Sequence, residues 1–104
     1  MTNFADMKPV AEKVADVMKT LAHANRLLAL CAMMECERSV GELAGSLNMR
    51  AQAMSQQLAI LRNKGLVRTR RDGQTVYYSL ASEEIRSLMN SLYATYCTPP
   101  SEHQ

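Results

Sequence analysis

The chain has 104 residues, of which 47% are apolar, and its 12 Lys and Arg against 10 Asp and Glu give a formal net charge of +2. This length predicts a single domain over residues 1–104 and excludes a multidomain enzyme with a deep cleft, while the apolar fraction excludes a disordered tail protein. No stretch approaches the roughly 20 apolar residues of a membrane span, and the first residues carry Asp6 and no apolar run, so we expect a cytoplasmic protein without membrane contact.

Two helices are predicted at the start of the chain. Apolar residues recur at helical spacing between residues 10 and 21, and Pro9 suits a first helical turn, which predicts a helix over residues 9–20. A second helix, over residues 25–34, has an apolar stripe that includes Cys31. The first stripe comprises Val10, Val14, Val17, Met18 and Leu21.

The middle of the chain has the pattern of a helix-turn-helix. Ser39 and Glu42 have the spacing of a capping box, which predicts a short helix over residues 40–47. Asn48 tolerates the left-handed conformation of a tight turn, and a further helix is predicted over residues 50–64. The motif also needs a small residue where its helices approach and apolar residues towards the core. These positions are filled by Ala44 and by Leu43, Leu47, Met49 and Met54.

A β-hairpin and a last helix complete the predicted fold. Asp72 and Gly73 separate two extended runs within residues 66–80, which predicts a hairpin with a primed turn. Its apolar side holds Val67, Thr69, Val76 and Tyr78, and its basic side holds Arg68, Arg70, Thr75 and Tyr77. The last helix, capped by Ser82, is predicted over residues 83–97 with a long apolar stripe. The fold class is therefore mainly α with a β-hairpin wing, in the order ααααββα, which is a winged helix-turn-helix.

Basic side chains are concentrated beside this motif. Six of them lie between residues 50 and 75 against one acidic residue, a local charge of +5, whereas the rest of the chain has six basic and nine acidic residues, a charge of −3. One face is therefore suited to a polyanion. Glutamine amides that face away from the core in the first turns of a recognition helix can read base edges, and arginines on a wing suit phosphate or the minor groove. The candidate DNA-binding residues are Gln52, Ser55 and Gln56 on the helix and Arg68, Arg70 and Arg71 on the wing.

Two other interpretations stay open from these residues. Any solvated helix face can carry glutamines, and a winged helix can bind another protein instead of DNA. A steep negative dependence of duplex binding on salt separates the DNA-binding interpretation from the protein-binding one. An enzyme is not expected, because the chain has no catalytic dyad, phosphate-binding glycine loop or metal triad, and no cofactor is expected.

Four runs of the chain resemble the ArsR/SmtB family of bacterial winged-helix repressors. They are Leu-Ala-His-Ala-Asn-Arg-Leu-Leu at 21–28, Met-Ser-Gln-Gln-Leu-Ala-Ile-Leu-Arg at 54–62, Lys-Gly-Leu-Val-Arg-Thr-Arg-Arg at 64–71 and Gln-Thr-Val-Tyr-Tyr-Ser-Leu at 74–80. The resemblance covers nearly the whole chain and departs at Gln57, where many members carry His. It implies a homodimer that pairs through its first and last helices, binds an inverted-repeat operator in double-stranded DNA and releases it when an inducer binds. The apolar stripes of the terminal helices independently favour a dimer, because so small a core cannot cover them.

The resemblance also bears on the inducer. Metal sensors of the family carry a cysteine pair on the first helix of the motif or a His/Asp/Glu set on the last helix, and neither is present here. His23 and His103 have no ligand partner at chelating spacing, so no metal site is expected.

The cysteines match a different subgroup. Cys31 and Cys97 resemble the two cysteines of family members that sense reactive sulfur species or oxidants, which implies that a disulfide or polysulfide bridge between them weakens DNA binding. Cys36 lies between Glu35 and Glu37, and neighbouring carboxylates disfavour a thiolate, so it is the expected bystander. Three alternatives remain: Cys31 merely fills the core, the repressor responds to a metal, or the protein acts by displacing another DNA-bound protein.

Overall fold

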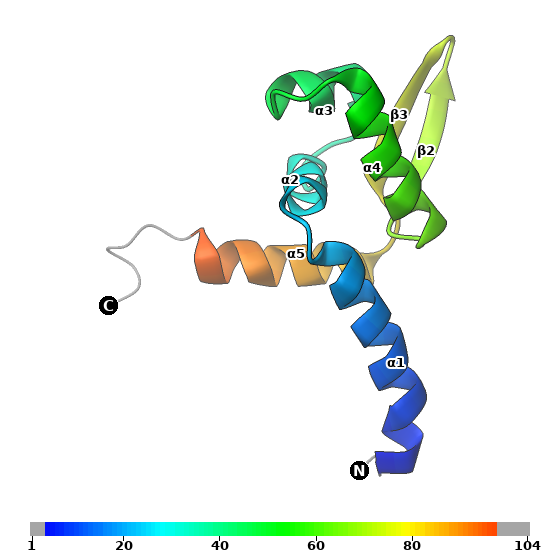
Figure 1. Ribbon diagram of the computed structural model, residues 1–104, viewed down its shortest axis with the longest axis vertical. Coiled ribbons are helices and arrows are strands. Elements are labelled where there is room, and N and C mark those ends of the chain that lie inside the picture. Colours follow the sequence, from blue (N-terminus) through cyan, green and yellow to red (C-terminus); the bar gives the residue numbers. More distant parts are fainter. Residues whose placement is uncertain (1–3, 98–104) are drawn as a thin grey trace.

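The computed structural model describes residues 4–97, which form five helices and a three-stranded antiparallel sheet (Figure 1). The chain order is α1 (Phe4–Leu21), α2 (Ala24–Ala32), β1 (Arg38–Ser39), α3 (Val40–Ser46), α4 (Ala51–Asn63), β2 (Val67–Asp72), β3 (Thr75–Leu80) and α5 (Glu83–Tyr96). The predicted winged helix-turn-helix is confirmed: α3 and α4 form the helix-turn-helix, and β2 with β3 forms the wing.

Two details of the predicted elements change. The predicted start of the first helix at Pro9 is wrong, because α1 begins at Phe4 and includes Pro9 as its sixth residue. Proline there removes one backbone hydrogen bond near the helix terminus, where the loss is tolerated more easily than in mid-helix. Strand β1 was not predicted, since two residues show no periodicity. It extends the wing into a sheet of order β1-β3-β2, with Arg38 opposite Tyr78.

The local turn chemistry sets the helix-turn-helix and the wing. Ser39 Oγ accepts a hydrogen bond from the Glu42 N–H at 3.1 Å, and Glu42 Oε1 accepts one from the Ser39 N–H at 2.9 Å, which completes the predicted capping box. Asn48, between α3 and α4, has a φ of 55°, and Gly73 in the hairpin turn has a φ of 63°. Both lie in the left-handed region that asparagine and glycine tolerate.

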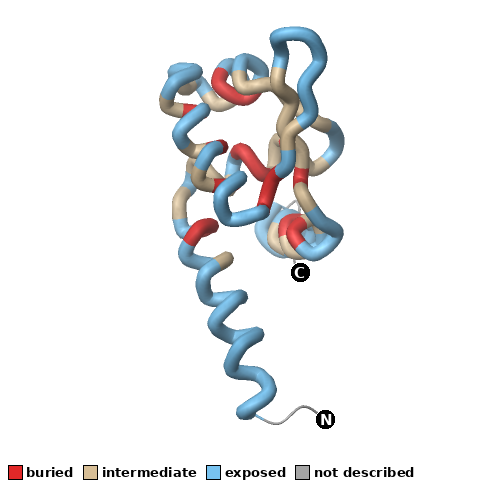
Figure 2. The backbone as a smooth tube through the Cα atoms, turned by 90° about the vertical axis from the view of Figure 1, so that its right-hand side faces the viewer, coloured by how far each residue is buried: buried red, intermediate tan, exposed pale blue. Residues whose placement is uncertain are grey.

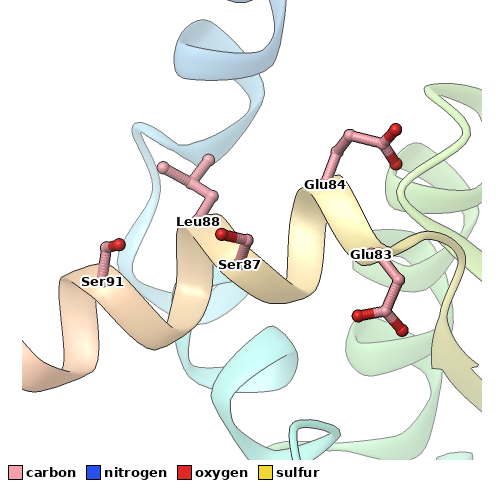
Figure 3. A pocket seen from close by; sticks show the side chains of 5 residues that line it. All are labelled: Glu83, Glu84, Ser87, Leu88 and Ser91. Atoms are coloured by element: carbon pink, nitrogen blue, oxygen red, sulfur yellow. The ribbon is translucent and has the colours of Figure 1, made fainter.

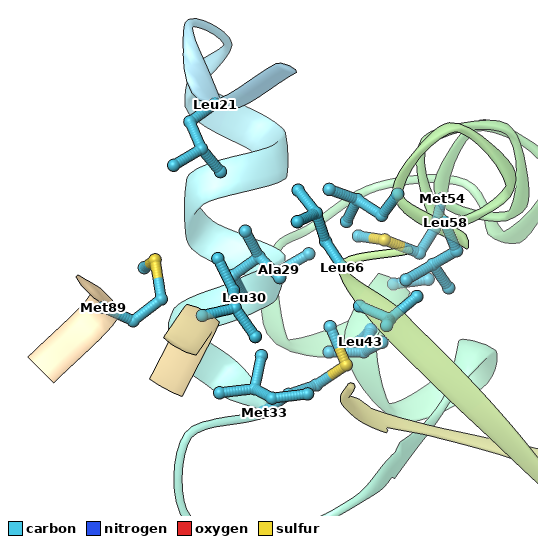
Figure 4. Close-up of a cluster of buried hydrophobic side chains, with 14 residues drawn as sticks. Leu21, Ala29, Leu30, Met33, Leu43, Met54, Leu58, Leu66 and Met89 are labelled. Atoms are coloured by element: carbon cyan, nitrogen blue, oxygen red, sulfur yellow. The ribbon is translucent and has the colours of Figure 1, made fainter. Parts of the chain in front are cut away.

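The core lies between α2, α3, α4, α5 and the base of the wing (Figure 4). Its largest fully buried side chains are Leu30, Met33, Leu43, Met54, Leu58, Leu61 and Met89. Replacing one such leucine with alanine typically costs about 2–5 kcal/mol, a large fraction of the roughly 5–15 kcal/mol by which a folded protein is stable. This core therefore holds α4 and the wing in a fixed relation to each other.

Helix α1 projects away from this body and packs on it only near its C-terminal end (Figures 1 and 2). Its residues are exposed along most of its length, and only Thr20 and Leu21 are buried (Figure 2). The exposed side includes the apolar side chains Phe4, Met7, Val10, Val14 and Met18. No helix of the described part is long and apolar enough to cross a lipid bilayer.

Candidate nucleic-acid interface and thiol pair

Helix α4 has one buried face and one polar exposed face. Met54, Leu58 and Leu61 are fully buried, and they anchor the helix to the core. The three predicted base-reading residues, Gln52, Ser55 and Gln56, are exposed, and within residues 4–97 their side chains make no hydrogen bond. The helix thus presents amide and hydroxyl groups whose donors and acceptors are available to a ligand.

Gln57 is the member of this glutamine run that faces inward. Its Oε1 accepts a hydrogen bond of 2.9 Å from Arg26 Nε, and the contact is partly buried. Successive residues of a helix are rotated by about 100°. Gln57 therefore faces inward, while its neighbour Gln56 is exposed. Sequence analysis noted Gln57 only as a departure from the family pattern and missed its partner, which comes from 31 residues earlier in the chain.

The wing has the predicted faces. The strand register pairs Thr69 with Tyr78 and Arg71 with Val76, and it pairs Arg68 with Ser79 and Arg70 with Tyr77 on the other face. All three predicted arginines are exposed on this ribbon. The structure therefore places all three arginines on the wing, which lies beside α4 (Figure 1), with Arg68 and Arg70 on one face of the ribbon and Arg71 on the other.

Arg70 differs from the other two arginines because it is already paired. Its guanidinium lies over the Tyr77 ring, 4.9 Å from the ring centroid, and its Nε donates to both carboxylate oxygens of Glu37 at 3.0 Å. This side chain crosses the sheet from β2, over β3, to the residue before β1. The hydrogen bond from Arg70 lowers the pKa of Glu37, and Glu37 in turn raises the pKa of Arg70. Glu37 is a functional candidate that sequence analysis missed, because only the three-stranded sheet brings it to the wing.

The two predicted switch cysteines lie on helices that pack together. Cys31, in α2, is half-buried against the core, and Cys97, at the end of α5, is exposed; both are free thiols. Burial raises the pKa of Cys31 above its ordinary value of 9.0, and the charge of Cys97 raises it further. The structure thus places the two thiols on helices that pack together, one partly buried and the other exposed. Cys36 is exposed and belongs to the segment between α2 and β1.

Arginines also hold the end of α2 just beyond Cys31. Arg38 Nε donates to the carbonyl oxygen of Ala32 at 3.1 Å, and Arg86 Nη1, from α5, donates to the carbonyl oxygen of Met34. Cationic donors at a helix C-terminus satisfy carbonyls that lack helical partners and favour the helix dipole. Helices α2 and α5 are therefore joined near Cys31 before any bond forms between the thiols.

No other small-molecule or metal site stands out in the part of the chain that is described. The hollow in Figure 3 runs along α5 and is lined by Glu83, Glu84, Ser87, Leu88 and Ser91, so one helix supplies all of its lining. Between residues 4 and 97, no three His, Cys, Asp or Glu side chains are placed to hold a metal ion. The Nδ1 atom of His23 is buried without a hydrogen-bond partner, and His103 lies outside the described residues.

An anchored helix with exposed amides, beside an arginine-bearing wing, defines a winged helix-turn-helix DNA-binding regulator. Residues 23–69 match the family model described as the bacterial regulatory protein, arsR family. The chain is 43% identical to the biofilm growth-associated repressor of Agrobacterium fabrum, over 89% of this chain and 80% of that protein. It belongs to the ArsR family of bacterial transcription regulators, which are not enzymes.

Two solved structures support the same assignment. The reduced form of HlyU from Vibrio cholerae superposes with a TM-score of 0.86 at 40% identity, covering 89% of this chain and 98% of that chain. A homodimeric winged helix-turn-helix domain from Mycobacterium bovis, described as a possible ArsR-family regulator, has a TM-score of 0.79 at 32% identity and covers 100% and 96%. The V. cholerae protein is described as a transcriptional activator.

Proposed function

We propose that this protein is a homodimeric transcriptional repressor whose affinity for an inverted-repeat operator falls when Cys31 and Cys97 become covalently linked. The observation that carries the switch is the placement of one half-buried and one exposed thiol on two helices that pack against each other. Repression is favoured by the description of the A. fabrum relative as a repressor.

In this proposal each protomer reads bases with Gln52, Ser55 and Gln56 of α4. These side chains are exposed and make no hydrogen bond within the described residues. A base edge can therefore bind them by displacing water, without breaking a contact inside the protein, which supports that role. Arg68 and Arg71 meet phosphates or the minor groove from the wing. Arg70 was expected to contact DNA with them; because it is paired with Glu37, we infer that it braces the wing and contributes less to DNA binding than Arg68 and Arg71.

The dimer forms through α1 and α5. Both helices expose large apolar side chains, of which Phe4 is 90% exposed and Tyr96 is 78% exposed. Contiguous exposed apolar surface of this kind marks a protein interface, and the M. bovis relative is described as homodimeric. A two-fold dimer presents its two recognition helices to half-sites about 34–36 Å apart, one turn of DNA.

The switch is an oxidation of the two thiols. The exposed Cys97 meets the oxidant first: a peroxide converts its thiol to sulfenic acid with release of water, or a persulfide donor transfers a sulfur atom to it and leaves as a thiol. The Cys31 thiolate then attacks the modified sulfur and expels water or hydrosulfide, which leaves an S–S bond and completes a two-electron oxidation. The new bond ties α2 to α5, in addition to the existing contact of Arg86 with the segment after α2, and alters the spacing of the recognition helices.

The test measures operator affinity before and after treatment with hydrogen peroxide or an organic persulfide. We expect a loss of about 5- to 150-fold, the range of a coupling free energy of 1–3 kcal/mol. Cys31→Ser and Cys97→Ser should abolish the loss, whereas Cys36→Ser should keep it. Intact mass shows whether the chain has lost two hydrogen atoms, as in a disulfide, or has also gained sulfur.

The outcomes separate the parts of this proposal. A response that survives in both the Cys31→Ser and Cys97→Ser variants removes the thiol switch and leaves the regulator intact. A response to zinc in a variant without cysteines favours a metal sensor. Transcription in vitro, with the operator overlapping a promoter, then distinguishes a repressor, which lowers transcript yield, from a protein that acts by displacing another DNA-bound protein.

A further inference from the structure

One guanidinium joins three helices in the middle of the molecule. Arg26, the third residue of α2, donates from Nε to Gln57 Oε1 of α4 at 2.9 Å and from Nη1 to the carbonyl oxygen of Thr20, in the last turn of α1, at 3.0 Å. Both contacts are partly buried. The side chain therefore connects the helix with the exposed apolar stripe to the helix with the exposed glutamines.

The groups around Arg26 fix the geometry of this connection between the helices. Thr20 is only 4% exposed, and its own Oγ1 donates to the carbonyl oxygen of Asp16 at 3.0 Å, so the end of α1 is fixed locally. A helix C-terminus has carbonyls without helical partners, and a cation is favourable there. The planar guanidinium holds its two acceptors in a set direction, which a flexible ammonium does not do.

A second and weaker contact also links α1 to α4. Lys64 is the C-cap of α4, and its Nζ lies 3.1 Å from Oδ1 of Asp16 in α1. Both side chains are about half exposed, at 44% and 54%. Exposed ion pairs of this kind contribute little, from about 0 to 1 kcal/mol. Arg26 is therefore the stronger of the two polar connections.

We propose that Arg26 is a positioning residue that sets the angle between α1 and α4 and thereby the separation of the two recognition helices in the dimer. The inference deepens the proposed function and rests on it. Helix α1 has 18 residues and so is about 27 Å long, which converts a small rotation at the Thr20 end into a large displacement along the dimer contact. On α4 the acceptor Gln57 is next to Gln56, so the same rotation moves a base-reading residue.

This role differs measurably from a DNA contact. Arg26 is partly buried between helices, where Nε and Nη1 each donate to an acceptor inside the protein, so we expect its removal to take away no phosphate contact. The slope of log affinity against log salt should then stay unchanged, whereas loss of a phosphate-binding arginine lowers that slope by about one. A positioning role also predicts a changed preference for half-site spacing.

The experiment uses the full chain and an operator selected from random duplexes by the wild-type protein. The operator is remade with its half-sites one base pair closer and one base pair further apart. Arg26→Lys keeps the positive charge but loses the planar guanidinium group. Gln57→Leu removes the hydrogen-bond acceptor at similar side-chain volume, whereas Gln57→Glu keeps an acceptor at this position. Lys64→Met, which removes only the exposed contact, is the matched control.

We expect Arg26→Lys and Gln57→Leu to weaken binding to the selected spacing about tenfold, a moderate coupling energy, and to lose the preference for that spacing. Gln57→Glu and Lys64→Met should both keep the wild-type affinity for the selected spacing and the preference for it. A uniform weakening at all three spacings, a lowered salt slope or no change would each overturn the inference. If the wild-type protein selects no operator, the proposed function fails first, and that result is separate from a failure of the variants.

Discussion

The terminal helices and the central motif expose opposite kinds of surface. Every large apolar side chain that the described residues leave exposed lies on α1, α2 or α5, and none lies on α3, α4 or the wing. These side chains are Phe4, Met7, Val10, Val14, Met18, Leu28, Tyr93 and Tyr96. The central motif buries its apolar groups and exposes amides and arginines instead. The chain therefore separates a surface suited to a protein partner from a surface suited to a polyanion.

The difference also concerns how the two surfaces are coupled. Burying one large apolar side chain is worth about 1.5–3 kcal/mol, whereas one base contact contributes about as much only at the matching DNA site. A dimer binds both half-sites at once, so loss of the apolar interface removes one whole set of DNA contacts. Changes at the terminal helices should consequently have larger effects on DNA binding than single changes on α4.

The largest effect is expected from Val14→Asp on α1. Val14 is 45% exposed in the middle of the apolar stripe, and a carboxylate there would be buried without a partner in the dimer, at a cost of several kcal/mol. We expect the dimer dissociation constant to rise more than about 100-fold and operator affinity to fall in parallel. Sedimentation velocity and DNA titration measure the two quantities.

Ala5→Asp is the matched control for this variant. It introduces the same charge nine residues before Val14 and about 180° from it, on the opposite side of α1 from the stripe. Ala15 is a poorer site for this control, because it is about 100° from Val14 but close to Phe4 and Met18, beside the stripe. We expect Ala5→Asp to remain dimeric and to bind the operator. A dimeric Val14→Asp protein would show that the partner surface is not α1.

Gln56→Ala on α4 should have the next largest effect. Loss of a bidentate base contact costs about 1–3 kcal/mol, so we expect roughly 10-fold weaker binding to the operator. Binding to unrelated duplex DNA should not change, because that binding depends on phosphates. Competition titrations with both duplexes check this, and an equal loss on both would remove Gln56 from the base-reading set.

Variants of Arg70 and Arg71 test whether an exposed charge that is already paired within the protein still contributes to DNA binding. Arg71 makes no salt bridge within residues 4–97, whereas Arg70 is held by Glu37 and Tyr77. Arg71→Ala should weaken operator binding several-fold and lower the salt slope by about one. Arg70→Ala should leave the slope nearly unchanged. The reverse ranking would mean that Arg70 leaves Glu37 and binds phosphate in the complex.

Local chemistry explains what could be predicted from the sequence. Ser39 with Glu42, Asn48 and Asp72 with Gly73 act on their own neighbours, so a capping box, a tight turn and a hairpin followed from adjacent residues. Helical spacing likewise separated Met54 and the core from the exposed Gln56. Predicting the order of the elements and the exposed face of α4 required only residues that are close together in the sequence.

Contacts between distant residues explain what could not be predicted. Glu37 reaches Arg70 across 33 residues and Arg26 reaches Gln57 across 31 residues, and neither pair has a sequence pattern. Three wing arginines looked equivalent in the sequence, yet one is paired. The proposed pairing of Cys31 with Cys97 came from a family resemblance, since no spacing rule relates residues on two packed helices.

Acidification should give the smallest effect, and a comparison with Glu37→Gln isolates the part that acts on the wing, because the pKa of Glu42 in the capping box is lowered as well. The Arg70 hydrogen bond lowers the pKa of Glu37 from its ordinary value of 4.5, so the folded state favours the carboxylate. A depressed folded pKa contributes stability that is present above the unfolded value and is lost as pH falls through the folded value. The wild-type protein should therefore have a slightly higher Tm than Glu37→Gln at pH 6, and the difference should disappear well below pH 4.5. Glu35→Gln, two residues away, should show no such pH-dependent difference, and if it did, the general charge of this segment would be responsible instead of the Arg70 pair.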